Sequence, residues 1–207
     1  TVANDALTIL VNQDNPLQCI TIEQANQIWG ADATVSTWGE VEGLDIPADF
    51  GDTSIALYGP GTDSGTFDFF TDIVNGEEGN IRIDYTSIGE DDNAAVTAIS
   101  GDVGAMGFVP FAFYQESLDL VKGLEIDGGD GCIAPTSENV LNGSYSPLGR
   151  ELYVYASDAA LSKPETVEFF NFYINNAADI ASVAGAVGLS PEQTEEQLAK
   201  VATLSCS

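Results

Sequence analysis

The chain has 207 residues, enough for one large or two small domains. It carries 33 acidic residues, 5 basic residues and no histidine, so its formal net charge is −28. Because so few lysines and arginines cannot form a basic patch, the composition argues against nucleic-acid binding. An anionic membrane surface would repel the chain as well. A negative charge of this size favours solubility, and it fits a salty exterior, where ions screen the self-repulsion.

Three cysteines, Cys19, Cys132 and Cys206, are widely spaced along the chain and lack the spacing of a zinc site. In an exported protein an odd number of cysteines indicates one disulfide and one remaining thiol. No apolar run approaches the roughly 20 residues that span a bilayer. The sequence begins with Thr1 rather than methionine, which is typical of a processed or trimmed product.

Strand and helix signals alternate along the chain, and this alternation predicts an α/β fold with a mostly parallel sheet. Thr21 and Gln24 fit a capping box, Asp91 is a helix-start signal, and Trp38 anchors an irregular loop at residues 31–53. Strands are expected at residues 7–11, 54–58, 104–109, 121–126 and 151–156. Helices are expected at residues 22–29, 67–76, 94–100, 111–118, 136–142 and 164–174, with a last one starting at Pro191.

Residues 58–70 are the centre of the functional interpretation. A strand signal ends at Tyr58, the run GPGTDSG follows, and an apolar face at helical spacing begins at Phe67. The first amides of a helix have no internal partner, and the helix dipole favours an anion there. Ser64 and Thr66 add hydroxyl groups, and Gly65 allows close approach of the backbone. A capped helix with a polar turn that binds nothing explains the same pattern, and the residues alone leave both interpretations open.

Another aromatic-rich stretch lies near the end of the chain. Residues 164–174 contain Phe169, Phe170, Phe172 and Tyr173, so the predicted helix is apolar around much of its girth. Such a helix needs a large surface to pack against.

Taken together, these stretches resemble one family. Residues 57–70 resemble the phosphate loop of the extracytoplasmic phosphate-binding proteins that serve phosphate ABC transporters, and residues 19–29 resemble the family's early helix. Further stretches at residues 84–85, 90–93, 104–108, 131–136, 143–145, 147–148 and 152–155 follow in the family's order. The resemblance covers nearly the whole chain, and it implies a type II periplasmic-binding-protein clamp that holds inorganic phosphate and delivers it to an ABC permease.

The resemblance also implies site residues. Ser64, Gly65 and Thr66 match phosphate ligands of the family, while Pro60 stands where better-known members have an arginine. Arg82 is a candidate for the missing cation, with a pairing to a neighbouring acid as the alternative. Asp63 is the local candidate for the carboxylate that accepts the proton of hydrogen phosphate and repels sulfate. No catalytic residue, metal ligand or cofactor is expected.

Family members carry roughly a hundred residues before the equivalent of Leu7, and these residues are not part of this sequence. The resemblance therefore implies one complete lobe at residues 8–150, while residues 1–7 and 151–207 form the hinge and the C-terminal part of the other lobe. We expect the absent segment, or a second copy, to cover residues 164–174. The expected location is periplasmic or extracellular, with a lipid anchor in the absent segment as one possibility. The isolated chain is expected to bind phosphate poorly.

Cys19 and Cys132 both fall in the lobe expected to be complete, at element boundaries beside turn residues, and we predict a disulfide between them. It would contribute roughly 3–5 kcal/mol in the chain-entropy model. Cys206 should then be unpaired, with any partner in the absent segment.

Other functions fit parts of the sequence. Asp63-Ser64-Gly65-Thr66 matches the loop of aspartic proteases, but a second copy of that motif is absent, so only a dimer could form the dyad. A serine hydrolase triad at Ser64 would need a histidine. Residues 127–131 allow a calcium site or, more simply, a glycine-rich turn. A secreted phosphate-scavenging or adhesion protein without a transporter would share the phosphate site.

Overall fold

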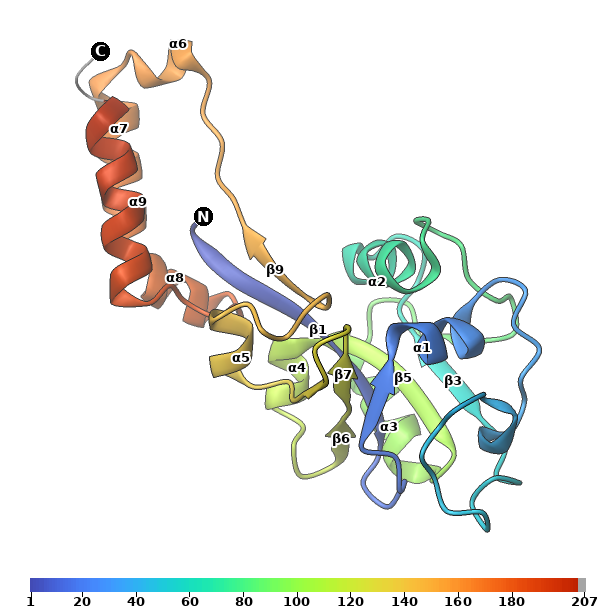
Figure 1. Ribbon diagram of the computed structural model, residues 1–207. Coiled ribbons are helices and arrows are strands. Elements are labelled where there is room, and N and C mark those ends of the chain that lie inside the picture. The colour runs from blue at the N-terminus through green and yellow to red at the C-terminus, as the bar shows by residue number, and fades with distance from the viewer. Residues whose placement is uncertain (205–207) are drawn as a thin grey trace. The chain divides into compact units, whose positions relative to one another are not determined.

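The computed structural model describes residues 1–204, which divide into two compact units. The loop unit comprises Leu7–Thr136 and Tyr145–Leu148. The terminal unit comprises Thr1–Ala6, Ser137–Ser144 and the chain from Gly149 onward. Residues 137–144, which the sequence assigned to the first lobe, therefore cluster with the terminal unit. We describe each unit by itself, with the labels of Figure 1.

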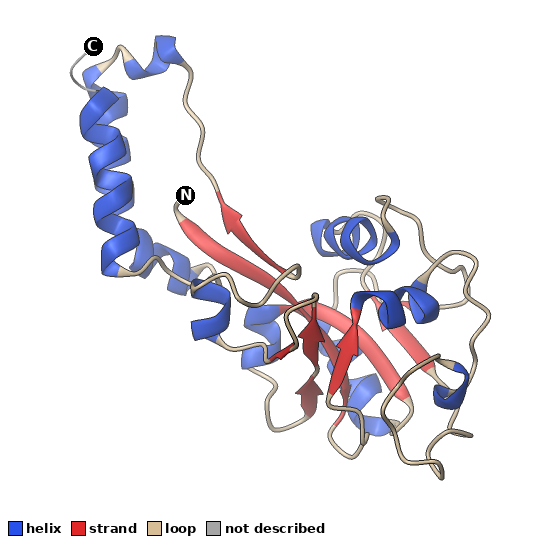
Figure 2. Ribbon diagram, in the orientation of Figure 1, coloured by secondary structure: helices blue, strands red, loops and turns tan. Residues whose placement is uncertain are grey.

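A mixed sheet forms the centre of the loop unit. Its strands are β1 (Ala3–Asn12), β3 (Ala56–Gly59), β4 (Thr86–Ser87), β5 (Ala105–Pro110) and β6 (Val121–Gly123), in the order β4-β3-β5-β1-β6. The strand β3 runs parallel to β4 and β5, whereas β1 runs antiparallel to both β5 and β6. The strands are drawn in red in Figure 2.

The prediction of a mostly parallel sheet is therefore wrong. Helical crossovers join β3 to its parallel neighbours, as the alternating signals predicted. The direction of β1 depends instead on pairing across about a hundred residues of sequence, for example Leu7 with Pro110 and Val11 with Met106. Nearly every residue of β1 is buried, as expected for a strand at the centre of a sheet with both faces covered.

The helices of the loop unit begin where the sequence indicated. Thr21 and Gln24 form the predicted capping box, and the side chain of Asp91 accepts a hydrogen bond from the amide of Ala94. Trp38 anchors its irregular loop, because it is fully buried and its ring N–H donates to the carbonyl of Gly104. The bounds are α1 (Ile22–Trp29), η1 (Trp38–Glu40), α2 (Gly65–Asn75), α3 (Asp92–Gly101) and α4 (Phe111–Gln115).

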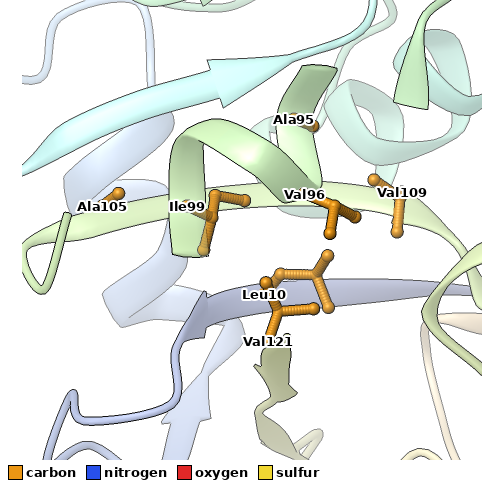
Figure 3. Packing of buried hydrophobic residues seen from close by; sticks show 7 residues of the cluster. All are labelled: Leu10, Ala95, Val96, Ile99, Ala105, Val109 and Val121. Carbon is orange, nitrogen blue, oxygen red and sulfur yellow. The ribbon is translucent and has the colours of Figure 1, made fainter. Parts of the chain in front are cut away.

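Two apolar clusters hold this unit together. In the first, α3 packs on the sheet, with the residues labelled in Figure 3: Leu10, Ala95, Val96, Ile99, Ala105, Val109 and Val121. In the second, Trp29 packs edge-to-face against Phe70 and Phe108, whose rings stack with centroids 3.8 Å apart. Burial of each large side chain contributes about 1.5–3 kcal/mol.

Close backbone approach between β3 and β5 depends on glycines. A Cβ atom at Gly107 would lie 2.5 Å from the carbonyl oxygen of Tyr58, and one at Gly104 would collide with the carbonyl oxygen of Ser54. Only glycine fits at these two positions without a backbone shift.

A small second sheet carries the predicted disulfide. It comprises β2 (Cys19–Thr21), β7 (Glu125–Asp127) and β8 (Cys132–Ile133), with β7 in the middle. Cys19 and Cys132 are bonded, and their Cα atoms lie 5.9 Å apart. The disulfide prediction is confirmed, while the predicted state of Cys206 lies outside the described residues. The single strand expected at residues 121–126 is two strands, because β6 pairs with β1 and β7 pairs with β2.

The terminal unit is mostly helical. Residues 3–6 of β1 pair antiparallel with β9 (Gly149–Leu152). The helices are α5 (Ser137–Leu141), α6 (Asp158–Leu161), α7 (Pro164–Asn175), α8 (Ala177–Val183) and α9 (Pro191–Leu204). The helices α7 and α9 are in contact, and they overlap in the view of Figure 1. The strand expected at residues 151–156 ends early at Leu152, because within the described chain no strand pairs with residues 153–156.

The aromatic helix α7 covers its apolar side incompletely. Phe169 is 53% exposed and Phe172 is 64% exposed, whereas Phe170 and Tyr173 are partly covered. Among the helices of residues 1–204, none is both long enough and apolar enough to cross a membrane.

Candidate anion site at the start of helix α2

The glycine-rich loop joins β3 to α2, as the sequence predicted. Ser64 is the N-cap of α2, with extended backbone angles of φ −93° and ψ 129°. Its hydroxyl accepts a hydrogen bond from the Thr66 amide at 3.2 Å, and its carbonyl accepts one from the Asp68 amide at 3.1 Å. Ser64, Gly65 and Thr66 thus lie together at the positive end of a helix dipole.

Two amides at this helix start, those of Gly65 and Phe67, lack a hydrogen-bond partner among the described residues. Gly65 is exposed, whereas Phe67 is buried. A Cβ atom added at Gly65 would meet nothing within 4 Å. The first turn of α2 therefore offers an unpaired donor with open space at Gly65, an arrangement that suits a small oxyanion.

The loop itself is tied to the segment before α3. The amide of Gly61 donates to the carbonyl of Gly89 at 3.0 Å, and the amide of Ile88 donates to the carbonyl of Gly59 at 2.9 Å. A further bond joins the Ser64 amide to the carbonyl of Gly61 at 3.1 Å. These bonds fix the loop on both sides and thereby set the direction in which α2 starts.

Asp63 lies at the exposed tip of this loop. Its carboxylate folds over Gly61, where an added Cβ atom would come within 2.9 Å of Oδ1. The position is next to the helix start in sequence, but among the described residues the carboxylate accepts no hydrogen bond from the amides of α2. Its role toward an anion stays a prediction.

Arg82 is held by other groups. The side chain is buried, and its Nε and Nη2 donate to the two oxygens of Asp84 at 2.5 and 2.8 Å. Its Nη1 donates to the carbonyls of Ile28 and Val35, both at 3.0 Å. The hydrogen bonds with Asp84 raise the pKa of Arg82, and the guanidinium lowers the pKa of Asp84.

The guanidinium of Arg82 therefore fastens the end of α1 and the following loop to the segment before β4. Most of its donors are occupied by groups that lie outside residues 59–66. The alternative of pairing with a neighbouring acid describes this geometry. A phosphate-binding role for Arg82 stays a prediction, and the geometry weighs against it.

Two possible cation sites receive no support. Cys19, Glu125 and Cys132 bring one ligand atom each to within 4.8 Å of one another, but metal ligation needs thiolates and these sulfurs are bonded to each other. In the turn at residues 127–131, Oδ1 of Asp127 accepts hydrogen bonds from the amides of Gly129 and Gly131. This carboxylate stabilises its own turn, in agreement with the simpler interpretation.

One residue near the loop, Tyr85, was part of the family resemblance but received no site role from the sequence. The hydroxyl of Tyr85 donates to the carbonyl of Pro60 at 3.1 Å, and its ring stacks on Phe67 at the first turn of α2. An aromatic residue between two polar ones gives no periodic signal, so only the fold reveals this contact.

Comparison with known proteins identifies the family of the chain. A family model described as a PBP superfamily domain matches residues 1–177. The protein SphX of Synechococcus elongatus is 38% identical over 191 residues, which are 91% of this chain and 55% of SphX. The chain thus spans about half of the length of this relative.

Solved structures show the same fold. The crystal structure of a possible phosphate binding protein from Planctomyces limnophilus superposes with a TM-score of 0.87 at 32% identity, covering 98% of this chain and 71% of that protein. An ABC-type phosphate transport receptor from Vibrio cholerae has a TM-score of 0.65 at 25% identity, covering 92% of this chain and 71% of the receptor.

Proposed function

Because this chain belongs to the PBP superfamily, we propose that it binds inorganic phosphate and delivers it to an ABC permease. The observation that carries this proposal is the unpartnered amide of the exposed Gly65, at the start of a helix that follows a glycine-rich loop. The names of the two structural neighbours, a possible phosphate binding protein and an ABC-type phosphate transport receptor, point to the same ligand. The protein captures its ligand without chemical change, since the proposed site offers hydrogen-bond donors and no activated nucleophile.

The proposed ligand shell combines backbone and hydroxyl donors. The exposed amide of Gly65 and the hydroxyl of Thr66 donate to phosphate oxygens, and the helix dipole adds a favourable field. Hydrogen phosphate also carries a proton, which needs an acceptor. Asp63 is the nearest carboxylate in sequence, and in this role it would favour hydrogen phosphate over sulfate, which has no proton to donate.

The net charge of −28 affects the rate at which phosphate is captured more than the affinity with which it is bound. Dipoles within a few ångströms of the anion outweigh distant charges that salt screens. Long-range repulsion nevertheless slows the encounter at low ionic strength. The rate of phosphate capture should therefore rise with added salt.

The proposal is tested by adding phosphate to the chain while observing the backbone amides by NMR. Phosphate should shift the signals of Gly65, Thr66 and Phe67, and sulfate should shift them less. Amides of α3 serve as the internal reference. If millimolar phosphate moves these three signals no more than chloride does, the chain does not bind phosphate at this loop.

Substitutions sharpen this experiment, each with a matched control. Gly65→Ala adds a methyl group in open space and should weaken the response to phosphate without loss of stability. Gly101→Ala makes the same change at the last residue of α3, where space is also open, and should leave the response unchanged. Thr66→Ala and Thr97→Ala form a second pair that tests the hydroxyl. Equal effects within either pair would refute the assignment.

We further propose that another polypeptide segment covers the exposed face of α7 around Phe169 and Phe172. A contiguous aromatic surface marks an interface or an aggregation risk. The covering segment belongs either to the part of the relatives that this chain does not span or to a second copy. Sedimentation of the 207-residue chain separates the two: a dimer that Phe172→Ser dissociates supports a second copy, and a monomer that the same change leaves unaffected supports a further segment.

The site is then shared between segments, and the 207-residue chain alone should bind phosphate weakly. Loss of half a shell of charge-assisted hydrogen bonds, at about 1.5–3 kcal/mol each, costs several powers of ten in affinity. Calorimetry with phosphate, sulfate and arsenate, on this chain and on one extended by the relatives' further segment, measures the difference. Micromolar binding by the monomeric chain alone would contradict this part of the proposal.

We place the protein outside the cytoplasmic membrane, in the periplasm or beyond it. The disulfide between Cys19 and Cys132 supports this location, because such bonds persist in oxidising compartments. Attachment through a lipid stays a prediction. Fractionation of the native source cells, with the disulfide state assayed by thiol labelling, checks the location.

A further inference from the structure

Tyr85 contacts the glycine-rich loop at two separate points. Its hydroxyl donates to the carbonyl of Pro60, at the entrance of the loop, over 3.1 Å. Its ring lies against Phe67, in the first turn of α2, with centroids 6.4 Å apart and planes 25° apart. The same side chain therefore contacts both the segment before the loop's turn and the helix after it.

Tyr85 also contacts the buried aromatic cluster of the loop unit. Its ring lies 6.2 Å from that of Trp29, which is fully buried and packs edge-to-face on Phe70 and Phe108. Proteins hold such interiors at crystal-like packing density, so this cluster moves little. Tyr85 thus links the aromatic core of the loop unit to the loop.

The hydroxyl of Tyr85 also remains a donor at all moderate pH values. Partial burial raises the pKa of Tyr85 above its ordinary value of 10.0. Pro60 has no N–H group, so its carbonyl is the backbone hydrogen-bonding group that it contributes to the loop. The bond from Tyr85 uses that group and fixes the loop at its entrance.

We propose that Tyr85 is a positioning residue of the anion site, which fixes the loop entrance relative to the start of α2 and so orients the free amide of Gly65. This inference rests on the proposed phosphate-binding function for its consequence, but its geometric part does not. Tyr85 does not touch the anion; it acts through Pro60 and Phe67. Specifically, the hydroxyl sets the loop entrance and the ring sets the helix start.

The first test needs no ligand. Tyr85→Phe removes the hydroxyl and keeps the ring, so the fold should persist while the loop loosens. Hydrogen exchange at the Gly61 and Ser64 amides should become about 3- to 10-fold faster, as expected for one lost hydrogen bond. The control is Tyr114→Phe, at a half-buried ring that packs on Phe111 and beside Gly123. Equal exchange at Gly61 and Ser64 in the two variants overturns the inference.

The second test measures the phosphate response. By NMR titration, Tyr85→Phe should weaken phosphate binding about 3- to 10-fold, with the unfolding midpoint unchanged relative to Tyr114→Phe. Tyr85→Leu, which also removes the ring contact with Phe67, should weaken it further. A loss of affinity matched by the same loss in Tyr114→Phe would mark a general effect on stability and overturn the positioning role.

The two tests separate this inference from the proposed function. Faster exchange in Tyr85→Phe, with no phosphate response in the unaltered chain, would refute phosphate binding and leave the positioning of the loop established. A phosphate response that Tyr85→Phe does not change would refute the positioning role and leave the proposed function intact.

Discussion

The two compact units bury the aromatic side chains of their helices to different extents. In the loop unit, α1 and α2 place Trp29 and Phe70 against a sheet, and both rings are fully buried. In the terminal unit, α7 packs along α9, and Phe169 and Phe172 remain exposed. The helical segments of both units have aromatic residues at helical spacing. The pattern therefore predicts that a face favours burial, while the surface that covers it depends on distant parts of the chain or on another chain.

The disulfide gives the largest expected difference between the units. Replacement of Cys19 and Cys132 by serine releases a crosslink between residues 113 positions apart. The loop unit should lose about 4–5 kcal/mol in the chain-entropy model. Both tryptophans of the chain lie in this unit, so urea unfolding followed by tryptophan fluorescence reports on it selectively. An unchanged midpoint would mean that the bridge constrains nothing in the unfolded state.

A pair of phenylalanine truncations compares the units directly. Phe70→Ala leaves a cavity between Trp29 and Phe108 and should cost about 3–5 kcal/mol. Phe172→Ala removes an exposed ring and should change stability by less than about 0.5 kcal/mol in the monomer. Denaturant titrations of the two variants measure both values. A comparable loss for Phe172→Ala would show that the face of α7 is already covered in solution.

Arg82→Lys examines the buried guanidinium of the loop unit. Lysine keeps the charge but loses the forked contact with Asp84, and it cannot reach both carbonyls of Ile28 and Val35. The expected loss of stability is about 2 kcal/mol. The amide shifts of Gly65 on addition of phosphate should stay as they are. A selective loss of the phosphate response at unchanged stability would instead make Arg82 a ligand.

Asp92 is expected to give a smaller, pH-dependent effect. Burial, with Glu90 and Asp91 nearby, raises the pKa of Asp92 to about 6 from its ordinary value of 3.8. An ionised carboxylate with a raised pKa destabilises the folded state, so the penalty appears as the pH rises from about 4 to about 6 and is complete above that range. Asp92→Asn should therefore stabilise the protein by about 1–2 kcal/mol at pH about 8 and have little effect at pH about 4. Thermal unfolding at both pH values measures this; a gain at the lower pH alone would contradict it.

Local features of the fold were accessible from the sequence, and long-range ones were not. Thr21, Ser64 and Asp91 begin helices because a capping side chain contacts amides two or three residues away. The direction of β1 and the end of β9 depend on partners far along the chain, and the sequence predictions were wrong at both. Local chemistry fixes where an element begins, and tertiary contacts fix how it pairs.

The candidate site shows the same difference between local features, which the sequence predicts, and long-range contacts, which it does not. The start of α2 was predicted from a strand, a glycine-rich loop and an apolar helical face, and these signals lie within about fifteen residues. The partners of Arg82, by contrast, include Ile28 and Val35, which are distant in sequence. Tyr85 reaches Pro60 across 25 positions. Sequence reasoning therefore located the loop but not the side chains that support it.

Mutagenesis of the glycines of the loop unit can distinguish positions where the fold requires glycine from a position where ligand binding requires it. In a saturation-mutagenesis library scored separately for folding and for phosphate capture, Gly104 and Gly107 should fail both screens, because a side chain there meets the backbone of Ser54 or of Tyr58 in β3. Gly65 should pass the folding screen with small residues and fail only the capture screen. Invariance of a glycine among homologues would look the same in all three cases. Only the difference between the folding score and the capture score would identify the position at which an added side chain clashes with the ligand and not with the protein.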